Sequence, residues 1–235
     1  MKISKDKQIE NRKKIMLIAV ELIAENGFKK TSMSKIAKKA KIGEATIYNY
    51  FPTKEHIVYE YYYYVQKETK KRLLELKEFS DMSLKEQVQT LLNTELEIMS
   101  NHRAFIQEVF EQMLYKSIFF QHEASQKGDE ELIMMVEELL DISIEAGEIE
   151  EINFSRTLQY LFLDYFFGIV YYWLKDESEY FDNTTIMVDK SLDVIYAVLQ
   201  SGLITKVESL FSFVVKTHIL SLIKPPKRYK KRSFR

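Results

Sequence analysis

Hydrophobic residues recur three or four positions apart along most of this chain, which is the spacing of amphipathic helices. The first run is followed by Gly27, a natural left-handed helix stop. Two shorter runs are separated by Lys41-Ile42-Gly43, and Pro52 ends the second of them. Thr31 or Ser32 can cap the first short helix. The pattern predicts helices at 5–26, 33–40 and 44–50, and a fourth that begins behind Thr53 and continues past Tyr61–Tyr64.

Longer helical patterns fill the rest of the chain. Ser83 and Glu86 have the spacing of a capping box. Gly128 and Gly147 bound one run, and Asn153 and Asn183 are the expected caps of two others. Only 6 Gly and 3 Pro occur in 235 residues, which favours long helices and an all-α fold. The predicted helices are about 83–100, 102–125 with a break, 129–146, 154–175, 185–200 and 204–223.

Composition excludes several classes of protein. Hydrophobic residues make up 46% of the chain, which is typical of a globular protein rather than a disordered one. The chain has no cysteine, so a disulfide framework and a thiolate metal site are both excluded. The charged N-terminus has no apolar signal region, and cytoplasm is therefore the expected location.

Charge divides the chain into three blocks. Residues 1–54 hold 13 Lys and Arg against 5 Asp and Glu, whereas residues 55–223 hold 14 against 30. The last twelve residues, 224–235, hold 7 basic and no acidic residues. A basic head joined to an acidic body is typical of a protein that binds phosphates at one end. The predicted domains are accordingly 1–54, 55–223 and a basic tail, whose role as a phosphate contact, a membrane patch or a solubility segment stays open.

The two short helices and their turn, residues 31–54, are a candidate helix-turn-helix. Ile36, Ala40 and Ile47 supply an apolar face where the helices cross, and the other face of the second helix stays exposed. Asn pairs with adenine, and Thr contacts a base edge or a thymine methyl, while Tyr, Lys and helix N-termini suit phosphates. An ordinary helical hairpin with solubilising lysines is the alternative. The candidate DNA contacts are Thr31, Ser32, Ser34, Lys41, Glu44, Ala45, Thr46, Tyr48, Asn49, Tyr50 and Lys54.

Residues 12–57 resemble the N-terminal domain of TetR-type transcriptional repressors. The resemblance rests on Gly27-Phe28, Ile36-Ala37, Thr46-Ile47-Tyr48 and Tyr50-Phe51 with Lys54 after it. It implies that the exposed face of 44–50 meets a double-stranded DNA operator, that the chain forms a homodimer, and that a C-terminal ligand-binding and dimerisation domain releases the operator. Two positions depart from the family pattern: Lys41 replaces the usual turn glycine, and Tyr50 replaces a common His. Lys41 adds a phosphate contact at the cost of strain if its φ is positive.

Residues 55–223 carry 25 of the 31 aromatic residues. The densest window, 154–173, has no continuous polar face, so as a helix it is expected to be buried nearly all round by its own bundle and a partner subunit. By resemblance, helices 154–175 and 185–200 form the dimer contact. The tyrosine run is expected to join the fourth helix to the body. A small hydrophobic effector is expected in a cavity lined by His102, Phe105, Phe110, Met113, Phe119, Phe120, Tyr160, Asp164 and Phe167, with Gln107 as a further polar anchor.

Two other function classes stay open on the residues alone. A membrane-associated protein would use 154–174 or 204–223, but Asp164 interrupts the first and its apolar run is short of the ~20 residues a span needs. A catalytic protein would use the aromatic cavity, but no nucleophile–base pair or Gly-rich phosphate loop is visible. The four histidines lack metal-ligand spacing. We therefore expect no enzyme activity, no cofactor, no metal and no membrane partner.

Overall fold

The computed structural model describes residues 4–114, 126–152 and 156–214. These residues form α-helices and two short 3-10 helices, and they contain no strand. The all-α prediction is therefore confirmed. The helices are α1 (Lys5–Asn26), α2 (Met33–Ala40), α3 (Glu44–Tyr50), α4 (Lys54–Glu75), α5 (Leu84–Ser100), α6 (Arg103–Leu114), α7 (Gln126–Glu145), α8 (Arg156–Lys175), α9 (Asp182–Gln200) and α10 (Leu203–Val214).

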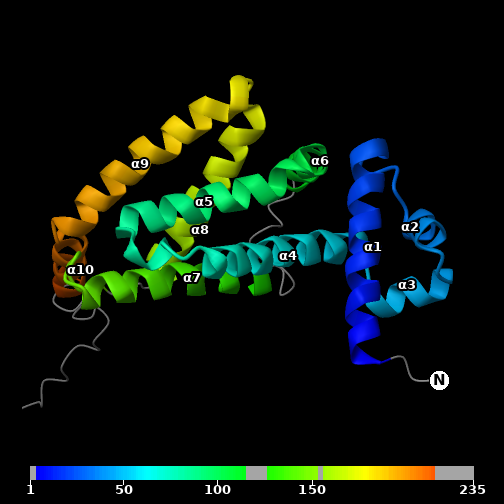
Figure 1. Ribbon diagram of the computed structural model, residues 1–235, viewed down its shortest axis with the longest axis horizontal. Coiled ribbons are helices and arrows are strands. Elements are labelled where there is room, and N and C mark those ends of the chain that lie inside the picture. The colour runs from blue at the N-terminus through cyan, green and yellow to red at the C-terminus, as the bar shows by residue number, and fades with distance from the viewer. Residues whose placement is uncertain (1–3, 115–125, 153–155, 215–235) are drawn as a thin grey trace, which may run out of the picture.

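The first three helices form a separate head at one end of the molecule. In Figure 1, α1 stands across the end of α4, and α2 and α3 lie on its outer side. All three helices have the predicted bounds. Ser32, and not Thr31, caps α2: its Oγ accepts a hydrogen bond from Lys35 N at 3.2 Å. The head core is made by Ile15, Ala19, Ile23, Ile36, Ala37, Ala40, Ile47 and Phe51, all buried.

Helix α4 connects the head to the body. It packs on α1 at its N-terminal end and on α5 and α7 along its length (Figure 1). In the tyrosine run, Tyr61 and Tyr62 are buried in the body while Tyr63 and Tyr64 are half-buried. One continuous helix therefore belongs to both parts.

Several helix boundaries in the body differ from the prediction. Ser83 and Glu86 do form the predicted capping box. Helix α7 begins at Gln126, so Gly128 lies in its first turn instead of before it. There the Tyr62 ring packs so closely that a Cβ on Gly128 would lie 2.3 Å from it. The glycine is thus a packing position and not a helix stop. Asn153 and the segments 115–125 and 215–223 lie outside the described residues.

The junction of α8 and α9 also differs from the prediction, because an aspartate organises it in place of Asn183. Asp176 Oδ1 accepts hydrogen bonds from Ser178 N at 2.9 Å and Ser178 Oγ at 2.6 Å. Its Oδ2 accepts from Thr184 N at 2.8 Å and Thr184 Oγ1 at 2.6 Å. Burial alone would raise the pKa of Asp176, but these hydrogen bonds outweigh it and hold the pKa well below its ordinary value. The α9 helix therefore begins at Asp182, before the predicted cap.

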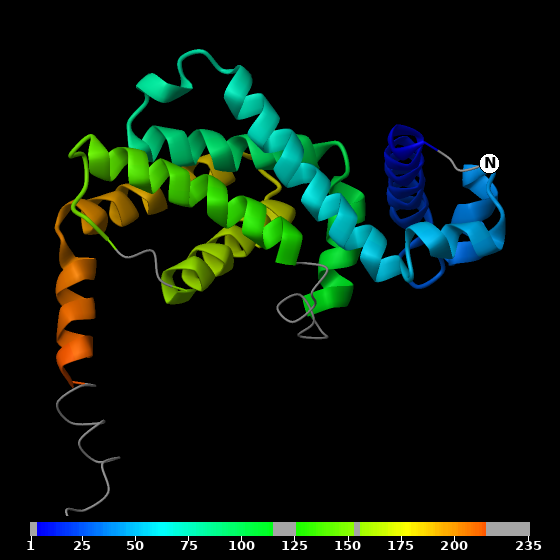
Figure 2. The same ribbon diagram turned by 90° about the horizontal axis from the view of Figure 1, so that it is seen from below.

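In the single chain, helix α8 is buried on its inner face and exposed on its outer face, where a partner subunit was expected. Its inner face is buried and includes Trp173, which is 1% exposed. Its outer face exposes Tyr160, Leu161, Tyr171 and Tyr172. Beyond it, α10 extends away from the body (Figure 2). Among the described helices, none is long and apolar enough to cross a membrane.

Candidate nucleic-acid interface and apolar cavities

Helix α3 presents one face to solvent because its other face is anchored in the head. Ile47 and Phe51 are both 0% exposed and fix the helix on the core. Gly43 precedes α3 in extended conformation and leaves the first turn open, without a side-chain cap. Tyr48, at 50% exposure, and Asn49 project from this helix. The predicted contacts that lie together on the exposed face are Glu44, Ala45, Thr46, Tyr48 and Asn49.

The turn before α3 contains a strained lysine. Lys41 has φ 58° and ψ 42°, in the left-handed region that glycine adopts without strain. Its N–H donates to Lys38 O at 3.2 Å, and Ile42 N donates to Ala37 O at 3.1 Å, which closes the end of α2. The φ of Lys41 is therefore positive, which is the condition under which strain was expected there. The Lys41 side chain is exposed at the edge of the α3 face.

Three of the predicted DNA-contact residues form hydrogen bonds within the head. Thr31 is 1% exposed, and its hydroxyl donates to the carbonyls of Leu22 at 3.1 Å and Gly27 at 3.0 Å. Lys54 donates to the Phe28 carbonyl, and its ammonium lies 4.2 Å from the centre of the Phe28 ring. Partial burial lowers the pKa of Lys54. Tyr50 is half-buried, and its hydroxyl accepts from Asn11 Nδ2 at 3.1 Å. These side chains shape the head, and Thr31 has no exposed surface to offer to DNA.

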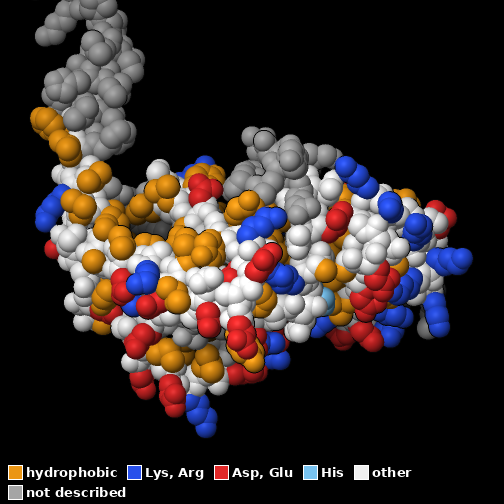
Figure 3. All heavy atoms as spheres, turned by 90° about the horizontal axis from the view of Figure 1, so that it is seen from above, with side chains coloured by type: hydrophobic (Ala, Val, Ile, Leu, Met, Phe, Trp, Pro, Cys, Tyr) orange, Lys and Arg blue, Asp and Glu red, His pale blue; other side chains and the backbone are white. Residues whose placement is uncertain are grey.

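Part of the positive charge of the head comes from residues that are not among the predicted DNA contacts. Lys29, Lys30 and Lys38 are exposed on α2 or just before it, and Ser34 is exposed on the same helix. Lys39 is instead paired with Glu21 at 3.2 Å. In Figure 3, Lys and Arg side chains gather at the head end of the molecule, on the right, whereas acidic and basic side chains mix on the body. The density of lysines between 29 and 41 was the signal for this surface.

Two polar contacts fix the head on the body. The Arg12 guanidinium donates to the Tyr50 carbonyl and to the Glu60 carboxylate, each at 2.6 Å, and so joins α1, α3 and α4. On the other side, the Glu108 carboxylate of α6 accepts from Phe28 N at 2.8 Å. Sequence reasoning missed both residues, because neither contact has a local motif. The head is thus held by both α4 and α6.

Among the described residues, only part of the predicted aromatic cavity is formed. Phe105, Phe110 and Phe167 line a small apolar cavity of about 50 Å³ between α4, α6 and α8. His102 lies beside it, with Nδ1 3.1 Å from the Tyr61 hydroxyl, and Gln107 is half-buried on α6. Tyr160, at 52% exposure, and Asp164 face solvent on α8 and do not line this cavity, which corrects the prediction. The Met113 side chain, Phe119 and Phe120 lie outside the described residues.

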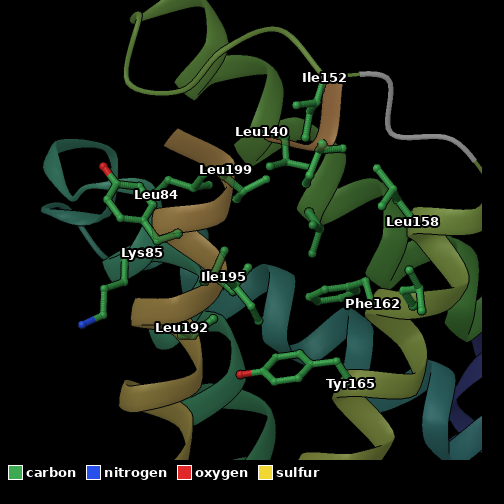
Figure 4. Close-up of a pocket in the computed structure, with 15 residues that line it drawn as sticks. Leu84, Lys85, Leu140, Ile152, Leu158, Phe162, Tyr165, Leu192, Ile195 and Leu199 are labelled. Atoms are coloured by element: carbon green, nitrogen blue, oxygen red, sulfur yellow. The ribbon is translucent and has the colours of Figure 1, made fainter. Parts of the chain in front are cut away.

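A larger apolar cavity of about 310 Å³ lies between α8, α9 and the helices α5 and α7 beneath them (Figure 4). None of the predicted ligand residues that the structure describes lines it. Its side chains come from segments more than a hundred residues apart, so no local pattern marked it. The lining residues are Leu84, Lys85, Val88, Val136, Leu140, Ile152, Leu158, Leu161, Phe162, Tyr165, Leu192, Ile195, Tyr196, Leu199 and Ile204.

One glutamate is buried at the centre of the body, and one aspartate near it is half-buried. Glu95 is 0% exposed, and its Oε2 accepts from Gln66 Nε2 at 3.0 Å. Burial raises the pKa of Glu95 to about 8, although the neighbouring polar side chains of Thr69 and Gln66 oppose the rise. Nearby, burial raises the pKa of Asp129 to about 7 against the opposing effect of Tyr62. Glu95 is therefore mainly protonated at neutral pH, close to α4.

A basic three-helix head that exposes one short helix, joined by α4 to a helical body, defines a helix-turn-helix DNA-binding regulator with a separate C-terminal domain. Residues 15–61 match the family model described as "Bacterial regulatory proteins, tetR family", and residues 87–216 match "Tetracyclin repressor-like, C-terminal domain". The chain belongs to the TetR family of transcriptional regulators. The resemblance seen in the sequence is therefore confirmed.

Individual relatives agree with this assignment. The HTH-type transcriptional regulator YhgD of Bacillus subtilis (strain 168) is 26% identical over 167 residues, which are 71% of this chain and 86% of that protein. The fatty acid metabolism regulator protein of the same organism is 50% identical over 52 residues, 21% of this chain and 27% of that protein. A solved TetR-family structure from Syntrophomonas wolfei has a TM-score of 0.62 at 19% identity and covers 80% of this chain and 95% of its own. That structural similarity supports the shared fold.

Proposed function

We propose that this regulator is a repressor that binds a pseudo-palindromic operator as a homodimer and leaves it when a small hydrophobic molecule binds the C-terminal domain. The observation that carries the proposal is that one face of α3 is anchored in the head and the other is free to meet DNA. Ile47 and Phe51 are buried in the core, while Thr46, Tyr48 and Asn49 are exposed. Asn49 is suited to an adenine edge and Thr46 to a base edge or a methyl group. Ser32, Ser34, Lys41 and the N-terminus of α2 are suited to phosphates.

The dimer face in this proposal is the outer side of α8 and α9. Tyr171 on α8 is 48% exposed, and Val194 on α9 is 65% exposed. Gly168 lies between the exposed tyrosines of α8, and a Cβ built on it would meet nothing within 4 Å in the single chain. Exposed apolar side chains on two neighbouring helices are typical of a face that a second subunit covers. Two such chains would present two α3 helices to successive major grooves.

In this proposal, the operator is released because the heads move. The Arg12 and Glu108 contacts tie the head to α4 and α6, so a ligand that changes the packing of the body changes the spacing of the two heads. A hundredfold weaker operator affinity needs only about 2.8 kcal/mol of differential binding. The proposal includes access to DNA and therefore a cytoplasmic location.

The test is selection of bound sequences from a random double-stranded DNA library by the purified protein. We expect a two-fold symmetric sequence with half-sites about one helical turn apart, bound by dimers. The matched variants are Gly168→Arg, on the proposed dimer face, and Glu137→Arg, which is exposed on α7. Gly168→Arg is expected to give folded monomers with at least about tenfold weaker operator binding, and Glu137→Arg to behave as the parent. Unaltered dimers of Gly168→Arg, or no enriched sequence at all, would contradict the proposal.

A further inference from the structure

The cavity between α8 and α9 is open to solvent at one side and closed by core residues at the other. Leu161 is 58% exposed and Ile195 is 37% exposed, and both line its mouth. Leu84 and Leu192 at its floor are buried, at 2% and 4% exposure. Figure 4 shows side chains converging on this space from α5, α7, α8 and α9. Figure 3 shows a hollow ringed by hydrophobic side chains on the body, close to α10.

The polar groups on its lining are already paired within the chain. The Tyr165 hydroxyl lies 2.8 Å from Ser191 Oγ, and the Tyr196 hydroxyl donates to Glu148 Oε1 at 2.8 Å. Lys85 Nζ donates to Asp189 at 2.8 Å and to Asp193 at 2.5 Å. Among the described lining residues, the one cation therefore faces two carboxylates, and the others are aliphatic or aromatic. The described walls thus offer hydrocarbon surface and no group that would recognise a carboxylate or a phosphate.

The volume of the cavity sets the size of the ligand. An apolar protein cavity of about 150 Å³ holds one benzene molecule. At about 310 Å³ this cavity has room for roughly twice as many carbons, on the order of ten to twelve. Ligand-binding pockets in proteins begin at about 300 Å³, so the cavity is within that range. The 50 Å³ cavity around Phe105 is too small for such a molecule.

We propose that the cavity between α8 and α9 binds an uncharged hydrocarbon group of about ten carbons, as a chain or as compact rings, and that this site is where the effector acts. The second part rests on the proposed function, whereas hydrocarbon binding itself does not. Both helices that form the mouth also carry the proposed dimer face, so a bound ligand sets the spacing of α8 and α9. The signal then reaches the heads through the arrangement of the two subunits as well as through α4.

Calorimetric titration of the full-length protein with 1-decanol tests the site. We expect binding that strengthens about fourfold for each methylene added from 1-hexanol to 1-decanol, because each added CH₂ leaves water. Decanoate carries the same chain with a carboxylate and is expected to bind no more tightly than the alcohol. A compact ring alcohol, 1-adamantanemethanol, distinguishes the two shapes: tighter binding of either molecule supports the site and identifies the shape it prefers.

Ile195 on α9 and Glu137 on α7 provide matched variants. Ile195 lines the cavity and Glu137 does not, and both are exposed enough to accept a larger side chain. Ile195→Trp is expected to weaken 1-decanol binding at least about tenfold, while Glu137→Trp retains parental affinity. Circular dichroism and light scattering on both variants separate these effects from loss of fold or of dimers.

The outcomes distinguish this inference from the proposed function. Absence of 1-decanol binding to parent protein that still binds DNA would overturn the site and leave the repressor proposal standing. Decanoate binding at least about tenfold tighter than 1-decanol, or equal binding by Ile195→Trp and the parent, would overturn it as well. If 1-decanol binds as expected but the protein selects no DNA sequence, the hydrocarbon site stands and the repressor proposal fails.

Discussion

Replacing Glu95 with Gln tests whether a buried carboxyl group limits stability at high pH. Glu95 lies on α5 against α4, is 0% exposed and receives one hydrogen bond from Gln66. Neither Glu95 Oε1 nor Gln66 Oε1 has a hydrogen-bond partner among the described residues. Protonation turns a carboxylate oxygen into a donor and removes the buried charge. Glutamine has nearly the same shape and is neutral at every pH, so the variant retains the packing and eliminates the titration.

The pKa of Glu95 sets the size and direction of the effect. Its pKa rises from 4.5 to about 8 on folding, chiefly through burial. Between these values the folded state binds more protons than the unfolded state, so this group's contribution to the free energy of unfolding falls as pH rises. One pKa unit corresponds to about 1.4 kcal/mol, which gives a limit of about 5 kcal/mol for the full shift. Glu95→Gln is therefore expected to gain stability relative to the parent as pH increases.

Urea denaturation followed by far-ultraviolet circular dichroism measures this difference, at fixed protein concentration because dimers unfold in a concentration-dependent way. We expect Glu95→Gln to gain about 3–5 kcal/mol relative to the parent between about pH 5 and pH 9. Asp129 titrates in the same direction in both proteins, so its effect cancels in the difference. Glu97→Gln, exposed on the same helix, is the control and is expected to show a flat difference. A difference for Glu95→Gln that is also independent of pH would refute the assignment of a protonated buried carboxyl group.

Two further predictions concern the turn of the head and the α8–α9 junction. Lys41→Gly relieves the left-handed backbone at φ 58° and is expected to raise the free energy of unfolding by about 1 kcal/mol, measured by urea denaturation. Unchanged stability would show that the turn is not strained. Because the lysine is exposed beside α3, the same variant is expected to bind DNA more weakly and with a smaller salt dependence. Asp176→Ala removes the acceptor of four hydrogen bonds and is expected to lower stability by about 3 kcal/mol at neutral pH. Since the pKa of Asp176 is lowered on folding, this loss is expected to shrink below about pH 4, and a thermal melt with the same deficit in acid would contradict it.

The sequence was most informative where structure depends on neighbouring residues. Helices α1, α2 and α3 have their predicted bounds because Gly27, Ser32 and Pro52 act locally on the backbone. The start of α9 was missed, because Asp176 accepts a hydrogen bond from Thr184 across a loop and this spacing does not match a helix-capping motif. The role of Gly128 in α7 was missed for the same reason, because the glycine packs against Tyr62 of another helix, α4.

The site shows the same division between local and long-range information. The exposed face of α3 followed from the position of Ile47 and Phe51 in the sequence. The inward hydrogen bonds of Thr31 and Lys54 were not predicted, since they depend on the loop between α1 and α2. The larger cavity was missed altogether, because its walls join α5, α7, α8 and α9. Aromatic residues indicated where the body was apolar but not where space remained between them.

Binding of α3 variants to the selected operator tests the central claim most directly. Asn49→Ala is expected to relax base preference at one position of each half-site, at a cost of about 1–3 kcal/mol, while Tyr48→Ala weakens binding to all sequences about equally. Leu74→Ala, which is 78% exposed on α4 in the body, is the control and is expected to bind as the parent does. We expect this pattern in a fluorescence anisotropy titration at constant salt. Parental affinity and base preference in both α3 variants would contradict the claim that α3 reads DNA.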